Sequence, residues 1–361
     1  MVRKTSELSG TEHVRTRAWT PSTIVRRSAG GISLASFLLL GGCSTRGWQS
    51  ALDPHGADAS RLAGLMRDFT WVCGIVWVLV MVALALTLFR SRTVLTAPTD
   101  PGSSPQTRTT VAVSTAVGAT VLIIAGLTLL SFVTTRGLTA GGPDTLTVRL
   151  RGYQWWWEFT YLDGKPDEVI TTANELHIPV GRPVKILLEA PDVIHSFWVP
   201  SLAGKKDLIP GRANDITILA QRPGTYRGQC AEYCGLQHAH MAFLVIADPP
   251  PAFAAWQAAQ RQSAVEPSDT EAAEGKRVFL EKPCAACHTI QGTPAAGTLG
   301  PDLTHVASRQ TIAAGQLPTT RGSLAAWIAD PQTIKPGNNM PMVPLTGDEL
   351  RAVSAYLVSL R

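Results

Sequence analysis

The sequence predicts a multidomain membrane protein that consists of a two-helix transmembrane hairpin, an all-β sandwich and a C-terminal all-α domain. Two uncharged apolar runs, residues 69–89 and 111–133, are each long enough to cross about 30 Å of hydrocarbon. Between residues 146 and 246, short β-prone runs alternate with Gly and Pro, as in a sandwich or barrel. Helices are predicted at residues 271–280, 323–329 and 347–360, the last with Thr346 as its N-cap.

Composition and the N-terminal segment support a membrane location. Only 16% of the 361 residues are charged, against roughly 25% in soluble domains. Residues 1–42 hold six Lys/Arg and two Asp/Glu, which explains most of the net charge of +5 and leaves no reason to expect a nucleic-acid partner. A basic stretch, an apolar run and a small Gly pair precede Cys43, as in a lipoprotein signal peptide. We expect cleavage before Cys43 and its lipidation, with a plain signal peptide as the alternative.

Charges between the two apolar runs predict the orientation. Arg90, Arg92 and Arg108 flank or occupy this loop, and its acidic residue is Asp100. Positive loops stay in the cytoplasm, so we expect a bacterial plasma-membrane protein with both C-terminal domains outside. The predicted segments are a signal peptide (1–42), an extracytoplasmic N-terminal segment (43–68), the hairpin (69–136), the β domain (137–248), a Pro/Ala/Gln-rich linker (249–270) and the α domain (271–361).

Thiols, imidazoles and a thioether recur within one loop of the β domain. The loop reads Cys230-Ala-Glu-Tyr-Cys234-Gly-Leu-Gln-His238-Ala-His-Met241, and all three donor types suit copper. A cupredoxin-like sandwich supplies a further His from a distant strand, for which His195 is the candidate. Two cysteines allow two bridging thiolates and therefore two metals. A disulfide and a structural zinc site are the alternatives.

A c-type haem attachment pattern lies near the start of the C-terminal domain. In Cys284-Ala-Ala-Cys287-His288, both thiols would form thioethers to haem vinyl groups, and the His would be the proximal iron ligand. Met340 is predicted to be the second axial ligand, with Met342 as the alternative. Met ligation raises the haem potential, which suits an electron carrier.

Both predicted centres are closed by His and Met ligands. No coordination position is then open to a substrate, which favours electron transfer over catalysis within this chain. Around the haem, Arg309 and Trp327 are candidates for contacts with the propionates, and ordinary packing or surface roles are the alternative.

These motifs resemble subunit II of cytochrome c oxidase with a fused C-terminal cytochrome c domain, as in caa-type haem-copper oxidases. Residues 192–212 and 230–241 look like the binuclear CuA signature of that family. The resemblance implies an all-β cupredoxin-like CuA domain and an all-α class I cytochrome c domain. It also implies magnesium at the Glu232 carboxylate, facing subunit I. The copper ligands that it implies are His195, Cys230, the backbone carbonyl of Glu232, Cys234, His238 and Met241.

The stretch 152–159 resembles the aromatic patch of the same family. Its first tryptophan, Trp155, is implied to be the surface residue at which electrons arrive from cytochrome c. For Trp156 and Trp157 the sequence leaves open a role there or in the core. His240 lies outside the motif and is expected near the surface. The second apolar run lacks the Glu, Trp and Pro of many family members and departs from the pattern.

The resemblance implies the electron-accepting subunit of an aa3/caa-type cytochrome c oxidase. Electrons would be received through covalently bound haem c and CuA and passed to the haem-copper site of subunit I, which reduces dioxygen to water coupled to proton translocation. Implied partners are subunits I and III, and cytochrome c or the cytochrome bc complex as the donor. The alternatives are a quinol oxidase subunit, a nitrous oxide reductase-like enzyme and a free-standing membrane electron carrier. The intact ligand set argues against the first, and the two membrane spans argue against the second.

Overall fold

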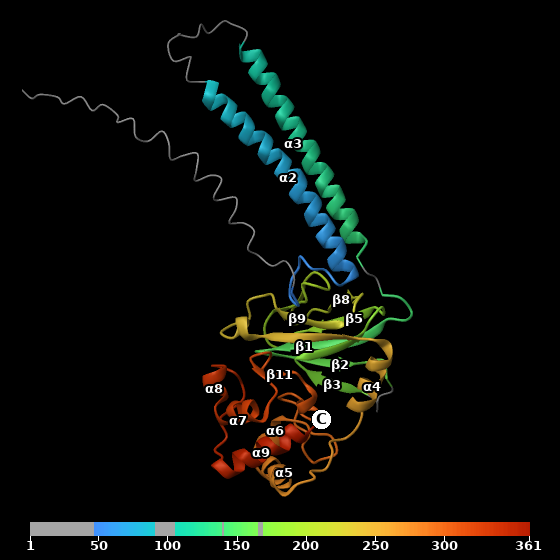
Figure 1. The fold of residues 1–361 in the computed structure, drawn as a ribbon, viewed down its shortest axis with the longest axis vertical. Helices are drawn as coiled ribbons and strands as arrows, with labels where there is room; N and C mark the ends of the chain where they lie inside the picture. The colour runs from blue at the N-terminus through green and yellow to red at the C-terminus, as the bar shows by residue number, and fades with distance from the viewer. Residues whose placement is uncertain (1–46, 91–104, 139–140, 165–168) are drawn as a thin grey trace, which may run out of the picture. The chain divides into compact units, whose positions relative to one another are not determined.

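The computed structural model describes residues 47–90, 105–138, 141–164 and 169–361 (Figure 1). The predicted signal peptide, Cys43, Arg92 and Asp100 lie outside these residues. The helices are α2 (Ala57–Arg90), α3 (Pro105–Arg136), α4 (Pro250–Gln260), α5 (Thr270–Glu281), α6 (Cys284–Cys287), α7 (Arg321–Ala329), α8 (Pro331–Ile334) and α9 (Gly347–Ser359), with short 3-10 turns η4 (His238–His240) and η5 (Val306–Ser308). The strands are β1 (Leu146–Tyr153), β2 (Trp156–Tyr161), β3 (Ile170–Ala173), β4 (Glu175–Pro179), β5 (Val184–Glu189), β6 (His195–Trp198), β7 (Lys206–Leu208), β8 (Asn214–Ile218), β9 (Gly224–Cys230), β10 (Ala242–Asp248), β11 (Thr311–Ile312) and β12 (Leu317–Pro318).

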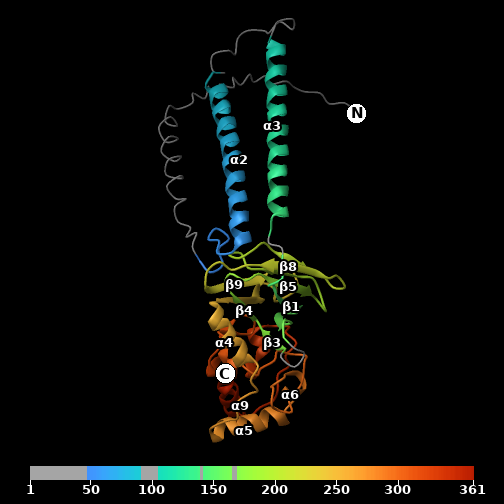
Figure 2. The same cartoon turned by 90° about the vertical axis from the view of Figure 1, so that its right-hand side faces the viewer.

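The two predicted apolar helices are present as α2 and α3, which lie side by side (Figures 1 and 2). Both are long and apolar enough to cross a membrane. At 34 residues, α2 is about 50 Å long and therefore exceeds the hydrocarbon thickness. Its first turns carry Arg61, Arg67 and Asp68, so the helix begins well before the apolar run that the sequence marks.

The start of α2 is attached to the β domain by backbone contacts. Gly56 pairs with Ala220 in an isolated bridge, and its N–H donates to the carbonyl of Ser201 at 3.1 Å. A Cβ at Gly56 would lie 2.1 Å from the carbonyl oxygen of Leu202, so no larger residue fits there. The segment before the first span therefore packs against the sandwich.

The β domain is a sandwich of two five-stranded sheets, with strand orders β3-β2-β1-β5-β8 and β4-β10-β9-β6-β7. β1 pairs in parallel with β5, and β10 with β4, while the other strand pairs within these sheets are antiparallel. Burial alternates strictly along β1, as expected of a strand with one face on the core. Large aromatic side chains fill the space between the sheets, including Trp157, Phe159, Phe197 and Phe243. The predicted all-β domain is confirmed.

The segment predicted as a linker contains helix α4 instead of running as an extended connection. Pro250 and its neighbour occupy the first helical positions, where a missing N–H costs nothing. Phe253 is buried against the sandwich core, and Trp256 stacks on His177 with ring centroids 4.2 Å apart. The aromatic side chains of this Ala-rich stretch therefore pack against the sandwich, whereas in a solvated linker they would remain exposed to water.

The C-terminal domain is helical, as predicted, and its main contact is between α5 and α9. Gly275 permits this close approach, because a Cβ there would lie 2.0 Å from the carbonyl oxygen of Ala352. Thr346 caps α9 in a capping box with Glu349, as the sequence indicates. The core between the helices contains Val278, Phe279, Leu324, Ile328, Val353, Tyr356 and Leu357.

Candidate copper and haem centres

The six donors proposed for copper come together at one end of the sandwich. Cys230 Sγ lies 3.7 Å from Cys234 Sγ and 3.9 Å from His195 Nδ1. Cys234 Sγ lies 3.6 Å from His238 Nδ1 and 3.8 Å from Met241 Sδ. The backbone carbonyl oxygen of Glu232 is 3.2 Å from Cys230 Sγ. His195 and both cysteines also form a compact group of buried metal-binding side chains.

Strand pairing brings His195 to the loop. β6 pairs with β9 so that Phe197 lies opposite Cys230, and this brings His195 close to Cys230, which is 35 positions away in the sequence. The Asp192 carboxylate accepts a hydrogen bond from His195 Nε2 at 2.9 Å, and this leaves Nδ1 facing the thiols. Gly152 leaves room for the imidazole, because a Cβ there would lie 3.1 Å from the His195 ring.

The two thiols form one hydrogen-bonded pair. The hydrogen bond from Cys234 lowers the pKa of Cys230 to about 3, and the same hydrogen bond raises the pKa of Cys234 well above its usual range. These shifts belong to the pair as a unit. Because thiolate is the metal-binding form of cysteine, a bound metal would displace the thiol protons of this pair.

The donor set fits two coppers better than the alternatives. The cysteines are free, and an Sγ–Sγ distance of 3.7 Å is far beyond the roughly 2.05 Å of a disulfide. A structural zinc ion takes about four ligands and rarely a thioether, whereas six donors converge here. Two thiolates between two imidazoles, with a thioether and a carbonyl, suit a copper pair.

Two polar residues of the loop point away from the thiols. The Glu232 carboxylate is 43% exposed and lies 3.7 Å from Lys205 Nζ, so it remains accessible to a cation or a partner. His240 is exposed, as expected, and its Nδ1 interacts with Gln237 Oε1 at 2.9 Å. His240 is therefore not gathered with the copper donors.

The haem attachment motif lines a cavity of about 480 Å³. Cys284 and Cys287 lie on the single turn α6, and His288 follows it. The carbonyl of Pro301 can only accept, so His288 Nδ1–H donates to it at 2.8 Å and Nε2 is left for iron. Burial lowers the pKa of His288, which favours the neutral, ligating form. Gly300 is required beside it, because a Cβ there would lie 2.6 Å from His288 Cε1.

Met340 lines the same cavity, whereas Met342 is 60% exposed. The backbone N–H of Met340 donates to Asn338 Oδ1 at 2.8 Å, and Gln332 Nε2 donates to the Met340 carbonyl at 3.0 Å. Asn338 in turn donates to the carbonyls of Pro331 and Lys335. The loop geometry thus supports Met340 as the second axial ligand.

Arg309 and Trp327 also line the haem cavity. Arg309 is buried, and burial lowers its pKa. Among the described residues, its guanidinium makes one hydrogen bond, to the carbonyl of Asp302, although it has five N–H donors. A guanidinium on the wall of this cavity favours an anion, so the cavity suits a haem propionate at Arg309.

Trp155 differs from the surface residue that the sequence led us to expect. It is 8% exposed and lines the haem cavity together with Trp156. Its Nε1 donates to the carbonyl of Cys234 at 2.9 Å, so one indole touches both centres. Trp157, by contrast, is a fully buried core residue, and its ring centroid lies 5.9 Å from that of His195 in an edge-on arrangement.

Lys335 is a buried residue of this region that sequence reasoning missed. It lies on the wall of the haem cavity, and its side chain reaches backbone carbonyls on both domains. Its position five residues before Met340 gives no signal of this, because the contacts are with residues far away in the sequence.

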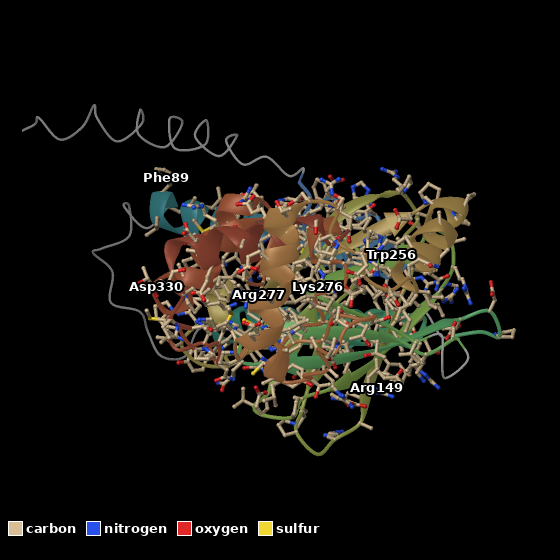
Figure 3. All side chains as sticks on the ribbon, turned by 90° about the horizontal axis from the view of Figure 1, so that it is seen from below. Phe89, Arg149, Trp256, Lys276, Arg277 and Asp330 are labelled. Atoms are coloured by element: carbon tan, nitrogen blue, oxygen red, sulfur yellow. The ribbon has the colours of Figure 1, made fainter. Side chains whose placement is uncertain are left out.

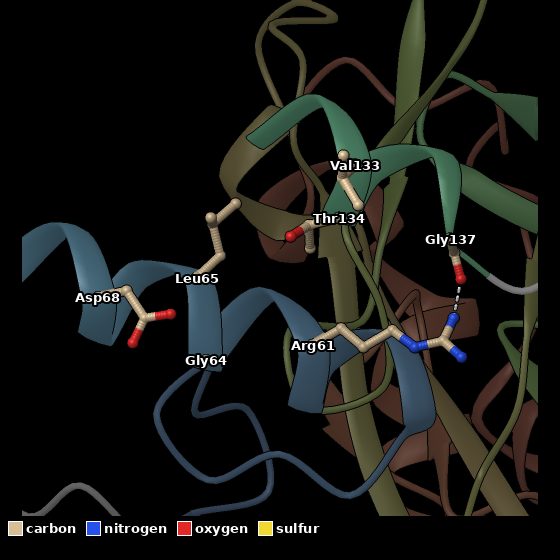
Figure 4. Close-up of a pocket in the computed structure, with 7 residues that line it drawn as sticks. All are labelled: Arg61, Gly64, Leu65, Asp68, Val133, Thr134 and Gly137. Carbon is tan, nitrogen blue, oxygen red and sulfur yellow. Dashed lines mark hydrogen bonds between the residues drawn. The ribbon is translucent and has the colours of Figure 1, made fainter. Parts of the chain in front are cut away.

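A second pocket, of about 380 Å³, lies between the outer ends of α2 and α3 (Figure 4). Arg61 spans it and donates from Nη1 to the carbonyl of Gly137. Its lining residues are Arg61, Gly64, Leu65, Asp68, Val133, Thr134 and Gly137, which include no thiol, imidazole or thioether. This pocket therefore offers no redox ligands.

Comparisons with known proteins find relatives of both domains. Residues 166–247 match the family model described as cytochrome c oxidase subunit II, periplasmic domain, and residues 272–361 match the cytochrome c family model. The first match contains the residues proposed as copper ligands, and the second contains the predicted haem attachment motif. A copper centre and a haem c are thus implied for the two domains.

Curated relatives share the same description. Cytochrome c oxidase subunit 2 of Alkalihalophilus pseudofirmus is 41% identical over 221 residues, which cover 61% of this chain and 63% of the relative. The subunit 2 of Bacillus sp. (strain PS3) is 36% identical over 231 residues, which cover 60% and 63%. A crystal structure of the periplasmic domain of cytochrome oxidase subunit II from Bradyrhizobium japonicum is 30% identical, covers 32% of this chain and 93% of that chain, and has a TM-score of 0.30.

Proposed function

Because this chain is related to subunit II of cytochrome c oxidase and carries a cytochrome c domain, we propose that it is the electron-accepting subunit of such an oxidase. Electrons received in the C-terminal domain pass to the copper domain and from there to the large catalytic subunit. That subunit reduces dioxygen to water and translocates protons. The match spans 63% of each of the first curated relatives, so the activity of the whole assembly is part of this proposal.

One observation carries the proposal. The Trp155 indole lines the cavity of Cys284, Cys287 and His288 and also donates to the carbonyl of Cys234. Two redox-suited sites that share a wall residue are expected of an electron relay. Neither site leaves a ligand position for a substrate, so the chemistry of dioxygen belongs to a partner subunit.

The copper domain supplies a rigid and dry ligand set. His195, Cys230, Cys234, His238, Met241 and the carbonyl of Glu232 would hold the two coppers, which supply one-electron transfer when bound. Asp192 keeps the His195 ring oriented, and the buried thiols exclude water from the pair. A site that is already assembled needs little reorganisation when its charge changes.

The C-terminal domain supplies a covalent haem site. Cys284 and Cys287 would hold the haem vinyl groups, and His288 Nε2 and Met340 Sδ would ligate the iron. The Met340 loop is held by Asn338 and Gln332, which keeps the thioether near the cavity. Attachment to the same chain replaces diffusional encounter with an effective concentration that reaches about millimolar for short linkers.

The remaining assignments concern the membrane and the partners. Two spans anchor the subunit in the bacterial plasma membrane with both outer domains extracytoplasmic, and lipidation at Cys43 adds a second anchor. The exposed Glu232 carboxylate binds magnesium where subunit I packs against the copper loop. Subunits I and III are the membrane partners, and cytochrome c or the cytochrome bc complex is the donor.

Electron paramagnetic resonance of the purified protein tests this proposal. We expect the hyperfine pattern of one electron shared by two equivalent coppers, together with the absorption spectrum of a low-spin haem c. The pattern of a single copper would contradict the paired site. If the chain purifies alone, without a large haem-bearing partner, the oxidase assignment fails and the free-standing carrier takes its place.

A further inference from the structure

Lys335 lies where the C-terminal domain meets the copper loop. Its side chain is 2% exposed, and Nζ donates to the backbone carbonyls of Trp155 at 2.6 Å, His240 at 2.8 Å and Ala313 at 3.2 Å. Trp155 and His240 belong to the sandwich, whereas Ala313 belongs to the C-terminal domain. One buried amine thus joins the two domains at the indole that separates the two centres.

The three acceptors select the charged form of this amine. An ammonium has three N–H donors, and a neutral amine has two. Burial lowers the pKa of Lys335 to about 7. No carboxylate of the described residues lies within ion-pair distance of Nζ. The dipoles of the three backbone carbonyls therefore stabilise the buried positive charge. Burying an ammonium in this way costs desolvation free energy. A contact of this kind therefore contributes more to fixing one arrangement of the domains than to net stability.

The backbone around Ala313 is shaped for this contact. Ala313 and Ala314 have φ angles of 54° and 58°, a left-handed conformation that is uncommon for residues with a Cβ. The Ala313 carbonyl accepts from Lys335, and the Ala314 carbonyl accepts from the N–H of Ala242 at 3.1 Å. One carbonyl therefore holds Lys335 within the C-terminal domain, and the next bonds directly to the copper domain.

Further contacts surround Lys335. Gln237, which is 4% exposed, donates from Nε2 to the carbonyl of Pro336 at 2.9 Å. The N–H of Gln310 donates to Glu175 Oε2 at 2.9 Å. The domains therefore meet through hydrogen bonds that we call the polar seam. The seam consists of the contacts of Lys335 with Trp155 and His240, and of the pairs Gln237–Pro336, Gln310–Glu175 and Ala242–Ala314.

We propose that Lys335 is a docking lysine, whose ammonium holds the C-terminal domain against Trp155 and thereby fixes the path between the haem and copper sites. Its consequence for electron transfer rests on the proposed function, but the docking itself does not. Lys335 is a positioning residue, because it hydrogen-bonds to none of the proposed metal ligands.

Amide hydrogen exchange in the full-length, purified chain tests the docking. The reporters are the N–H groups of Ala242 and Gln310, which bond across the seam. Lys335→Met should speed their exchange by roughly 10- to 100-fold, because a hydrogen bond to a charged group is worth about that factor in an equilibrium constant. Lys276→Met is the matched control, since Lys276 lies on α5 (Figure 3) and pairs with Glu266 away from the seam. Unchanged exchange at both reporters in Lys335→Met would overturn the proposal.

Flash reduction of the haem in the assembled complex gives the second readout. In Lys335→Met, transfer to the copper site should slow by roughly 10- to 100-fold, and the copper midpoint potential should fall because a nearby positive charge stabilises the added electron. Lys335→Arg should retain more of the transfer rate and more of the copper midpoint potential than Lys335→Met. If Lys335→Met does not accumulate, Lys335→Gln keeps the donors without the charge and is judged by the same measurements. If the wild-type protein lacks paired copper or haem, the proposed function is refuted. The amide exchange measurement would still decide whether Lys335 docks the two domains.

Discussion

The copper and haem sites of this chain are built in opposite ways. The copper donors are gathered in the interior of one domain, with sulfur and nitrogen atoms 3.6 to 3.9 Å apart. The haem donors line a cavity of about 480 Å³ whose wall includes Trp155 and Trp156 of the other domain. The first site therefore depends on one loop and one strand, and the second on how two domains meet.

The largest expected effect comes from the copper side. Cys234→Ser should abolish the shared-electron copper signal and lower oxidase turnover by more than about 100-fold, because even residues that only support metal ligands are worth 10- to 100-fold. Haem attachment should persist, since its cysteines lie in another domain. Paramagnetic resonance, turnover and haem absorption measure this. Cys73→Ser, at an exposed cysteine on α2, is the control. Loss of haem together with copper would break the comparison.

The next effect separates the two candidate axial methionines. Met340→Ala should lower the haem midpoint potential by on the order of 0.1 V, within the ~0.8 V range that axial ligands span. Met342→Ala should leave the potential unchanged, because that side chain is 60% exposed and does not line the cavity. A potentiometric titration followed by haem absorption measures both. The reverse pattern would move the ligand to Met342.

A smaller effect is expected where the haem ligand is held by packing. Gly300→Ala would bring a Cβ to 2.6 Å from His288 Cε1, which must then shift. We expect a loss of about 1–3 kcal/mol in the stability of the C-terminal domain, as for other overpacked sites, and reduced haem loading. Denaturant unfolding and haem content measure it. Gly347→Ala is the control, because nothing lies within 4 Å of a Cβ there.

The smallest effect concerns the pH dependence of stability at His177 on β4. Burial alone would lower the pKa of His177, but hydrogen bonds with Asp248 and Glu175 raise it above its ordinary value. A raised folded-state pKa contributes stability below the unfolded pKa of about 6.5, and this contribution is lost as pH rises through the folded value. His177→Gln should therefore destabilise the chain more at about pH 5.5 than at about pH 9. Thermal unfolding at both pH values measures this, and a difference independent of pH would contradict it.

Much of the fold followed from local pattern. Apolar runs predicted the two long helices, alternating β-prone runs predicted the sandwich, and Thr346 predicted the start of α9. The segment around Trp256 was the exception. Its Pro and Ala content favours a linker, but contact with His177 and the sandwich makes residues 250–260 a helix, and such tertiary burial is invisible to composition.

The chemistry that each domain offers could be predicted from short motifs. The donors of Cys230 to Met241, and those of Cys284 to His288, lie within a few residues of one another, and short spacing nearly fixes their geometry. The way in which the domains meet could not be predicted from these motifs. Trp155 and Lys335 are 180 residues apart, and the three carbonyls around one ammonium come from separate loops. Contacts of that range depend on the packing of whole domains, which no local spacing of residues can specify.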